Sequence, residues 1–213
     1  MARKGVIMFF AFLRKKRVFA LLFISLIGLL FYSNDWLGRW IYPIHYQDEI
    51  RIASSQSQLD PFIVSAIIRV ESNFKSDKIS SKGAIGLMQI MPDTAEWITD
   101  LSTGSSKDIS SRLTIPEVNI QVGTWYLNFL QKQFEQRLAA MESNQDHIAL
   151  IAAAYNAGPG NVNKWLQEGT WDGSYSELDF IPFGETRHFV QRILYYYKKH
   201  ERYYSGIWYN RES

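Results

Sequence analysis

The stretch from residue 60 to residue 71 places the tightest constraint on what this 213-residue chain can fold into. Asp60 precedes Pro61, and this pair starts a helix well, because the carboxylate caps free backbone amides and the proline ring already holds a helical φ. Apolar residues then recur at helical spacing: Phe62, Ile63, Ala66, Ile67 and Val70. The pattern predicts a helix that buries one apolar face against other elements.

Glu71 ends this helical pattern, and its position at the edge of the apolar face makes it a candidate acid. It lies four residues after Ile67 and eight after Ile63. A carboxyl group at such an edge loses water, and desolvation raises its pKa toward the value that a general acid needs near neutral pH. The other interpretation is a helix-end glutamate that turns to solvent or pairs with Lys75 or Lys78. Taken alone, the helix favours this second interpretation.

The N-terminal part of the chain has the character of a membrane anchor. Residues 1–17 carry six basic residues, and Val18 to Tyr32 is then an unbroken apolar run of fifteen residues. That is short of the roughly 20 residues that span a hydrocarbon core, but flanking basic and aromatic side chains can extend it. A cleaved signal peptide is the alternative, and no small-x-small cleavage site follows the run. We therefore expect an anchor at residues 18–34, with residues 1–17 cytoplasmic and the remainder outside the cell membrane.

The remainder of the chain divides, by composition, into a linker at residues 35–44, a domain at residues 45–204 and a tail at residues 205–213. Within the domain, further helix starts are indicated by a proline or an acidic residue: Pro92, Pro116, Asp146 and Glu185. Gly- and Ser-rich stretches separate these helices and are expected to form loops. No segment alternates apolar and polar residues as strands do, and no internal repeat occurs. The sequence predicts an all-α fold.

Composition excludes several kinds of chemistry. The formal net charge of +2 gives no argument for nucleic-acid binding, and the absence of cysteine removes disulfides, thiolate nucleophiles and Cys-based metal sites. The four histidines do not lie at ligand spacing with carboxylates, and no phosphate-binding loop or serine-hydrolase motif is present. We expect neither a metal nor an organic cofactor. The aromatic content of 15% suits a rich core or platforms for sugar rings, and composition does not separate these.

Three further segments depart from plain helix. Residues 83–91 combine glycines with an amide, Gln89, between apolar residues, which is most often a tight turn. Residues 152–158 end a helix of very small residues with Tyr155 and Asn156, and a tyrosine there is most often part of the core. Glu185 stands in the first turn of the last helix, where it complements the helix dipole. Each segment alone has an ordinary structural explanation.

Together, and in this order, the segments change the interpretation. Glu71-Ser-Asn-Phe, Gly83-Ala-Ile-Gly-Leu-Met-Gln-Ile-Met-Pro92, Ala154-Tyr-Asn-Ala-Gly158 and Ile181-Pro-Phe-Gly-Glu-Thr-Arg187 closely resemble the motifs of the soluble lytic transglycosylase catalytic domain family. That family has a goose-type-lysozyme-like α-helical fold and cleaves bacterial peptidoglycan. The resemblance covers residues 45–204. It implies peptidoglycan glycan strands as the partner, and the sequence does not identify protein partners.

The resemblance implies that Glu71 is the single catalytic acid and base. It also implies a set of residues that contact the sugar or shape its site: Ser80, Gln89, Met91, Tyr155, Asn156 and Glu185. Within this set, Tyr155 resembles the tyrosine that faces the catalytic glutamate, and Glu185 resembles the second glutamate of the family, which shapes the site and does not attack. Phe189 stands where the family often has tyrosine, so one hydroxyl contact is expected to be missing.

A single acid suits this kind of glycan cleavage. Ordinary glycosidases use two carboxylates, whereas in substrate-assisted enzymes a group of the sugar takes the second role. In the reaction that the resemblance implies, neutral Glu71 protonates the leaving oxygen and then, as a carboxylate, removes the proton from the muramyl C6 hydroxyl, which closes onto C1. A hydrolase of the same fold that uses water, a muramidase, is the nearest alternative. A catalytically silent glycan-binding module is the alternative from another class.

Overall fold

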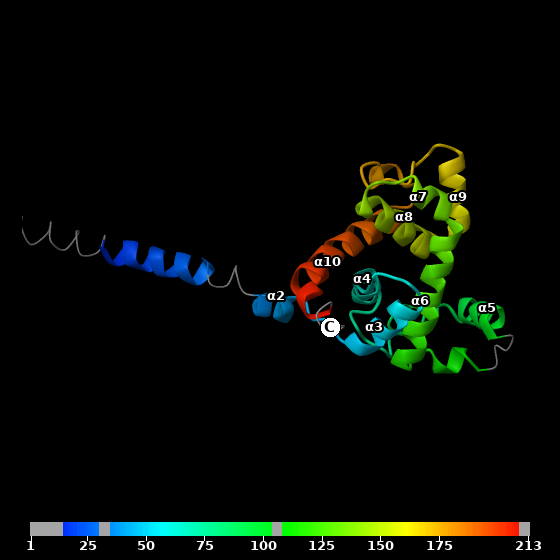
Figure 1. The fold of residues 1–213 in the computed structure, drawn as a ribbon, viewed down its shortest axis with the longest axis horizontal. Helices are drawn as coiled ribbons and strands as arrows, with labels where there is room; N and C mark the ends of the chain where they lie inside the picture. The colour runs from blue at the N-terminus through cyan, green and yellow to red at the C-terminus, as the bar shows by residue number, and fades with distance from the viewer. Residues whose placement is uncertain (1–14, 30–34, 104–107, 209–213) are drawn as a thin grey trace, which may run out of the picture. The chain divides into compact units, whose positions relative to one another are not determined.

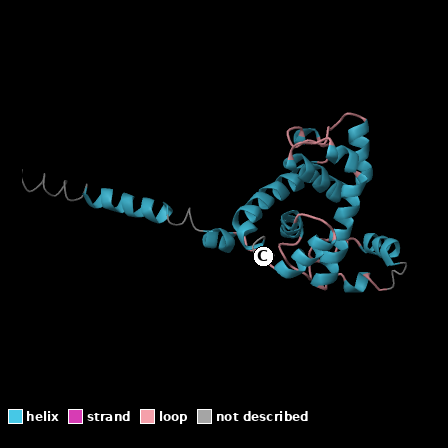
Figure 2. Ribbon diagram, in the orientation of Figure 1, coloured by secondary structure: helices cyan, strands magenta, loops and turns pink. Residues whose placement is uncertain are grey.

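The computed structural model describes residues 15–29, 35–103 and 108–208, which are drawn in colour in Figure 1. Contacts divide the chain into two compact units, residues 1–41 and 42–213. Almost all regular structure in the described residues is helical (Figure 2). The only β-type pairings among them are two isolated bridges, from Ile79 to Ile85 and from Ile85 to Ile90. The all-α prediction is confirmed.

The first unit contains a helical segment at residues 15–29 and helix α2 (Asp35–Ile41). Within the described part of the chain, no helix is both long enough and apolar enough to cross a membrane. Residues 1–14 of the expected basic segment and residues 30–34 of the expected anchor lie outside the described residues. Helix α2 occupies most of the expected linker, with an acidic residue in its first turn and a basic residue in its last, which suits the helix dipole.

The second unit holds the helices that form the domain. They are α3 (Gln47–Gln56), α4 (Pro61–Glu71), α5 (Pro92–Thr103), α6 (Pro116–Gln133), α7 (Glu135–Ala139), α8 (Asn144–Ala157), α9 (Pro159–Gln167) and α10 (Gly184–Trp208), with short 3₁₀ turns η1 (Ser110–Arg112) and η2 (Leu178–Phe180). The helix starts expected at Pro92 and Pro116 are confirmed. The last helix runs past the expected end at Tyr204, so residues 205–208 of the expected tail are helical, and residues 209–213 lie outside the described residues.

Helix α4 is the centre of the domain and begins as expected. The Asp60 carboxylate accepts a 2.8 Å hydrogen bond from the Phe62 amide, and Pro61 occupies the first helical position. Eight of its eleven residues are buried, which is more than the single face that the periodicity indicated. The reason is that α10 and α3 both pack against it. Full burial of each large apolar side chain contributes roughly 1.5–3 kcal/mol, so α4 is a rigid support for the residue at its end, Glu71.

Polar pairs fix α10 against α4 at two levels. At the start of α4, the Tyr197 hydroxyl donates a 2.8 Å hydrogen bond to Asp60. Half-way along, the Ser65 hydroxyl lies 2.9 Å from Nδ1 of His200, and both side chains are buried. Buried polar groups of this kind need their partners, so these pairs set the register between the two helices.

Helix α8 brings a third group of residues to the same region. Its residues Ala152, Ala153 and Ala154 are fully buried, and such small side chains allow α10 to approach closely. The sequence predicted that Asp146 starts and caps this helix, and this is wrong, because α8 begins at Asn144. Ser143 is the cap and accepts a hydrogen bond from the Gln145 amide, while Asp146 accepts one from the Tyr175 amide in a distant loop. Because Ser143, three residues upstream, caps the helix, the Asp146 carboxylate is available for a tertiary contact.

Candidate active site

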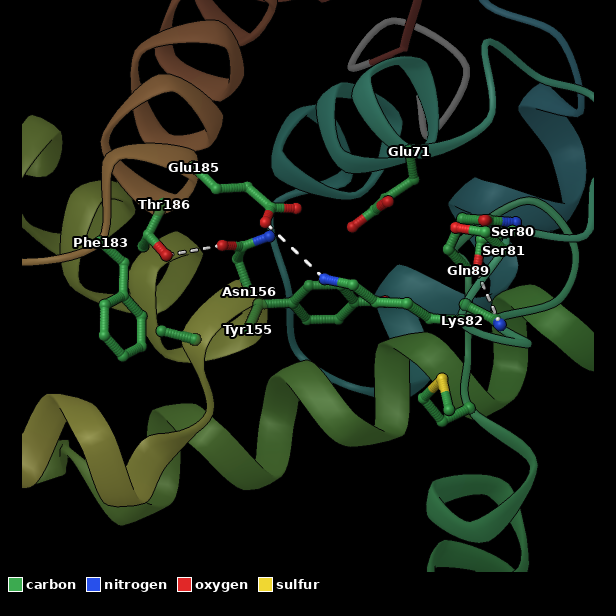
Figure 3. Close-up of a pocket in the computed structure, with 13 residues that line it drawn as sticks. Glu71, Ser80, Ser81, Lys82, Gln89, Tyr155, Asn156, Phe183, Glu185 and Thr186 are labelled. Atoms are coloured by element: carbon green, nitrogen blue, oxygen red, sulfur yellow. Dashed lines mark hydrogen bonds and ion pairs between the residues drawn. The ribbon is translucent and has the colours of Figure 1, made fainter.

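A cavity of about 640 Å³ opens where α4, the loop after it, α8 and the start of α10 meet (Figure 3). All seven residues that the sequence resemblance singled out line it: Glu71, Ser80, Gln89, Met91, Tyr155, Asn156 and Glu185. Six further residues complete the lining: Ser81, Lys82, Ala84, Ala157, Phe183 and Thr186. These six residues were not among those expected from the sequence to line the site. Asp77, the acidic residue nearest to Glu71 in sequence, does not line the cavity.

Glu71 provides the ionisable centre of the cavity. Its burial raises the pKa of the carboxyl group to about 7, the nearby charges of Lys78 and Arg192 oppose this rise, and the charge of Glu185 adds to it. The expected pairing with Lys78 takes another form, since the Lys78 ammonium donates its hydrogen bond to the backbone carbonyl of Glu71. That bond caps the end of α4 and leaves the carboxyl group facing the cavity. A carboxyl with this pKa exchanges a proton readily near neutral pH.

The loop after α4 contributes one hydrogen-bond acceptor and one donor to the cavity. The side-chain amide of Gln89 donates to the carbonyl oxygens of Lys78 at 3.0 Å and Gly86 at 2.9 Å. Both of its N–H groups therefore hold the loop, and Oε1 remains as an acceptor. The Ser80 hydroxyl oxygen accepts a 2.9 Å bond from the Ala84 amide, which leaves its proton available for donation.

Asn119, on α6, holds this loop in place and was not among the site residues expected from the sequence. Its Oδ1 accepts from the Met88 amide at 2.8 Å, and its Nδ2 donates to Ile85 at 2.9 Å and to Leu113 at 2.8 Å. The side chain is fully buried. A Cβ atom at Gly86 would lie 2.3 Å from Nδ2 of Asn119, so only glycine permits this approach. The sequence feature that could have indicated this role is the amide residue Asn119 within the apolar helical pattern of α6.

Tyr155 closes the cavity from α8. Its hydroxyl donates a 2.7 Å hydrogen bond to the Met88 carbonyl oxygen. Burial, and then the negative charge of Glu71, raise the pKa of Tyr155 well above its usual value, so the phenol stays protonated. The ring of Phe189 stacks on that of Tyr155 at a centroid distance of 6.4 Å. Phe189 therefore supports the tyrosine from behind and brings no hydroxyl of its own.

The opposite wall of the cavity comes from the start of α10. Thr186 donates a 2.7 Å hydrogen bond to Oδ1 of Asn156, which directs the amide nitrogen of Asn156 away from Thr186 (Figure 3). Oε2 of Glu185 lies 3.7 Å from the Lys82 ammonium, in an ion pair that reaches from one wall to the other. Both side chains are more than three-quarters exposed, at 79% for Lys82 and 76% for Glu185. Such a pair contributes about 0–1 kcal/mol, so it can open when a ligand enters.

The arrangement therefore combines one partly buried, desolvated acid with a solvated second carboxylate, a phenol and several neutral polar groups. Among the described residues, no group of three or more His, Cys, Asp or Glu side chains comes together as a metal site. The groups present can transfer one proton and hydrogen-bond a neutral, hydroxyl-rich ligand.

Comparison with known proteins agrees with this site. The family model described as the transglycosylase SLT domain matches residues 48–176, more than half of the chain. The chain belongs to the transglycosylase SLT domain family. Its helical domain is accordingly an all-α, lysozyme-like SLT domain.

Individual relatives match this SLT domain over most of the chain. The soluble lytic murein transglycosylase of Escherichia coli K12 is 34% identical over 168 residues, which are 78% of this chain and 24% of that protein. The crystal structure of the 70 kDa soluble lytic transglycosylase from Escherichia coli matches with a TM-score of 0.66 and 32% identity, over 78% of this chain and 26% of that chain. A lytic transglycosylase from Pseudomonas aeruginosa, solved as an inactive mutant, matches with a TM-score of 0.63 and 33% identity, over 76% of this chain and 25% of that chain. This chain thus corresponds to about a quarter of the length of these relatives.

Proposed function

We propose that this chain is a peptidoglycan lytic transglycosylase. It cleaves the β-1,4 bond from N-acetylmuramic acid to N-acetylglucosamine and leaves 1,6-anhydro-muramyl ends. The observation that carries the proposal is the Glu71 carboxyl, whose pKa is raised by burial to about 7 within a cavity lined by the family's motif residues. Membership of the SLT domain family, and matches to relatives named as lytic murein transglycosylases, support it.

Glu71 performs both proton transfers in this proposal. As a neutral acid it gives its proton to O4 of the departing N-acetylglucosamine while the bond from C1 to O4 breaks. As a carboxylate it then takes the proton of the muramyl C6 hydroxyl while the C6 oxygen bonds to C1. The proton on Glu71 is restored and no water is consumed. A pKa near 7 suits a residue that must act in both directions.

The neutral polar groups of the cavity suit the N-acetyl group of the sugar. An N-acetyl group offers one carbonyl acceptor and one N–H donor. The Ser80 hydroxyl has a proton to donate and Gln89 Oε1 is an acceptor, so the two are complementary to it. Holding the N-acetyl group beside C1 lets its oxygen stabilise the cationic sugar, as in substrate-assisted enzymes.

A hydrolase remains the alternative because of Glu185. Sequence reasoning assigned this residue to shaping the site, yet its carboxylate lines the same cavity as Glu71 and its charge raises the pKa of that acid. A second carboxylate across a sugar could activate water. Against that role stands its solvated, Lys82-paired position at the edge of the cavity. We assign Glu185 to binding and shaping the site.

Digestion of purified peptidoglycan tests the proposed function. The wild-type chain is expected to release soluble muropeptides, and Glu71→Gln is expected to fold and bind the polymer without releasing them. Glu185→Gln serves as the second arm and is expected to keep measurable release. Release by Glu71→Gln at the wild-type rate would remove Glu71 as the acid, and loss of all release in Glu185→Gln would favour the hydrolase.

We also propose that residues 18–34 anchor the enzyme in the cell membrane, with residues 1–17 in the cytoplasm and the domain facing the wall. The support is the apolar run from Val18 to Tyr32 behind a basic block. Apolar side chains of this run are exposed, for example Phe19 at 72% and Leu22 at 65%. In a membrane these side chains contact lipid. Fractionation tests it: the intact chain is expected with the membranes and its domain open to protease added to spheroplasts. A mature chain that begins near residue 33 would contradict the anchor.

A further inference from the structure

The chain enters the helical domain on the C-terminal half of α10, and aromatic side chains hold the entry point there. The Tyr42 ring stacks on that of Tyr203 at a centroid distance of 5.9 Å, and its hydroxyl lies 2.6 Å from the Tyr195 hydroxyl. Two residues further on, the amide of the buried Ile44 donates a 3.1 Å hydrogen bond to the Tyr204 hydroxyl. These contacts fix where the N-terminal segment joins the domain.

Cationic side chains surround this entry point. The Lys199 ammonium lies 5.6 Å from the centre of the Tyr42 ring and 5.5 Å from that of Tyr195. Among the described residues, Lys199 forms no ion pair within 4.0 Å. The Arg202 guanidinium lies over the Tyr203 ring at 5.5 Å. We call these five residues, all at least partly exposed, the tyrosine face: Tyr42, Tyr195, Lys199, Arg202 and Tyr203.

Helix α10 contributes only positive charge to the tyrosine face. Its two acidic residues are Glu185, in the first turn, and Glu201. The Glu201 carboxylate lies 3.3 Å from the Tyr197 hydroxyl, which donates to Asp60 at the start of α4. Glu201 is therefore on the side of α10 that packs against α4, away from Lys199.

The short N-terminal connection limits how far the tyrosine face can lie from a membrane. This step rests on the proposed anchor at residues 18–34, from which residues 35–41 alone lead to Tyr42. As helix α2 these seven residues are about 10 Å long, and fully extended they reach no more than about 25 Å. A domain of this size is roughly 40 Å across, so the side that carries Tyr42 is the side that can reach the lipid.

Helix α2 has the composition of a helix at a bilayer surface. Trp36 and Trp40 lie four residues apart, and therefore on one face, and they are 60% and 72% exposed. Tryptophan and tyrosine are enriched where a bilayer meets water, because their rings are apolar and their polar tips can stay hydrated. A connection at headgroup level brings Tyr42 to that level as well.

We propose that the tyrosine face binds the anionic phospholipid headgroups of the membrane that carries the anchor. Lys199 and Arg202 donate to lipid phosphates, while the tyrosine rings lie between headgroups. Negative lipid attracts each Lys or Arg held near its surface. Binding keeps the cavity, which Glu185 and Thr186 of the same helix line, within about 40 Å of the lipid, the length of α10. Under the proposed function, the enzyme is thereby directed to the glycan strands next to the membrane.

The distance from domain to lipid is measured in the full-length chain. The chain has no cysteine, so a single one can be introduced for a fluorophore. Gly206→Cys lies seven residues after Lys199, on the same side of α10, and Gly160→Cys on α9 is the matched control. Both glycines are exposed and have open space at Cβ. Figure 1 shows α9 and the end of α10 on opposite sides of the domain.

The fluorophore is quenched by lipid whose headgroup carries a nitroxide, in nanodiscs with and without phosphatidylglycerol. At low salt we expect phosphatidylglycerol to increase quenching at residue 206 by about threefold or more. Quenching at residue 160 should not change. Raising the salt to about 0.5 M should remove the increase, because exposed charges are then screened.

Charge variants show whether the tyrosine face makes the contact. Lys199→Gln with Arg202→Gln should abolish the increase at residue 206. Lys199→Arg with Arg202→Lys keeps both charges and should retain the increase, which a role in packing alone would not predict. Arg112→Gln with Lys132→Gln removes two exposed cations elsewhere and is expected to have no effect.

Each outcome supports or overturns the lipid contact. Equal quenching at the two positions, or an increase that Lys199→Gln with Arg202→Gln leaves intact, would overturn it. Binding of soluble polyphosphate through these two residues, with no effect of lipid charge, would also overturn it and give the face another ligand. Muropeptide release is not part of the measurement, so failure of the proposed reaction would leave the result unchanged.

The anchor is judged separately, by whether the chain enters nanodiscs of neutral lipid. If it does not, the anchor fails, and the chain is added instead to vesicles that contain phosphatidylglycerol. The tyrosine face then stands only if Lys199→Gln with Arg202→Gln weakens binding to these vesicles by about tenfold or more. An unchanged affinity would overturn it.

Discussion

The hydroxyl of Tyr155 donates a 2.7 Å hydrogen bond to the carbonyl oxygen of Met88. On the other side of the same residue, Oδ1 of Asn119 accepts a 2.8 Å bond from the Met88 amide. The backbone of Met88 is thus held from α8 and from α6 at once. Since Gln89 follows directly, these two bonds fix the part of the loop that faces Glu71. The phenol has given its only proton to Met88, so it can offer only lone pairs to the acid.

Tyr155→Phe tests this bond. The change removes one hydrogen bond and almost no volume, so we expect a loss of about 1 kcal/mol in the free energy of unfolding. We expect a larger effect on catalysis, a fall of roughly tenfold or more in kcat/KM, because a loosened loop misplaces the groups around the sugar. Chemical denaturation and muropeptide release measure the two effects. Destabilisation with full activity per folded molecule would reduce Tyr155 to a core residue.

Asn119→Ala should be more damaging than any surface change on α6. It leaves the Met88 amide and the Leu113 carbonyl without their partner in the interior and removes one of two bonds to the Ile85 carbonyl, which costs about 2–4 kcal/mol. Asn128→Ala is the matched control, since Asn128 lies on the same helix and makes one 2.7 Å bond, to the Ser57 carbonyl. That control should lose about 1 kcal/mol. Equal losses in the two variants would contradict the role given to Asn119.

The contrast between Glu71 and Asn119 shows what could be predicted from the sequence. The desolvation of Glu71 followed from local spacing, because the cap at Asp60 and the apolar stripe fix which way the end of α4 faces. The role of Asn119 did not, because its partners Ile85 and Met88 lie 34 and 31 residues away, and helical spacing carries no information about them. The order of the motifs indicated which residues line the cavity at Glu71. A second cavity beside it, lined by Arg69, Lys78 and Arg192 among others, depends on the packing of α10 beside α4 and could not be predicted from spacing.

The raised pKa of Glu71 predicts a pH-dependent cost to stability. Its carboxyl titrates at 4.5 in the reference state and at about 7 in the folded chain. Between these values the unfolded chain loses the proton first, so the free energy of unfolding falls as the pH rises through this window. Glu71→Gln removes the cost. Its stability should match the wild type near pH 4 and exceed it near pH 8 by on the order of 2 kcal/mol.

Thermal denaturation of the two proteins at both pH values checks this expectation. The sign is the informative part, because loss of an ordinary structural carboxylate would destabilise the fold at pH 8. A variant that is less stable than the wild type at pH 8 would show that the Glu71 carboxyl is favourably paired, and the account of a desolvated acid would fail.

The central claim is that the sugar's own C6 hydroxyl, and not water, takes the place of the leaving group. It is tested most directly by mass spectrometry of the muropeptides that the wild-type chain releases from purified peptidoglycan. The account predicts that most of them end in 1,6-anhydro-muramic acid, each lighter by one water than the product of hydrolysis. A digest dominated by full-mass, reducing muramyl ends would contradict it and assign Glu185 the activation of water.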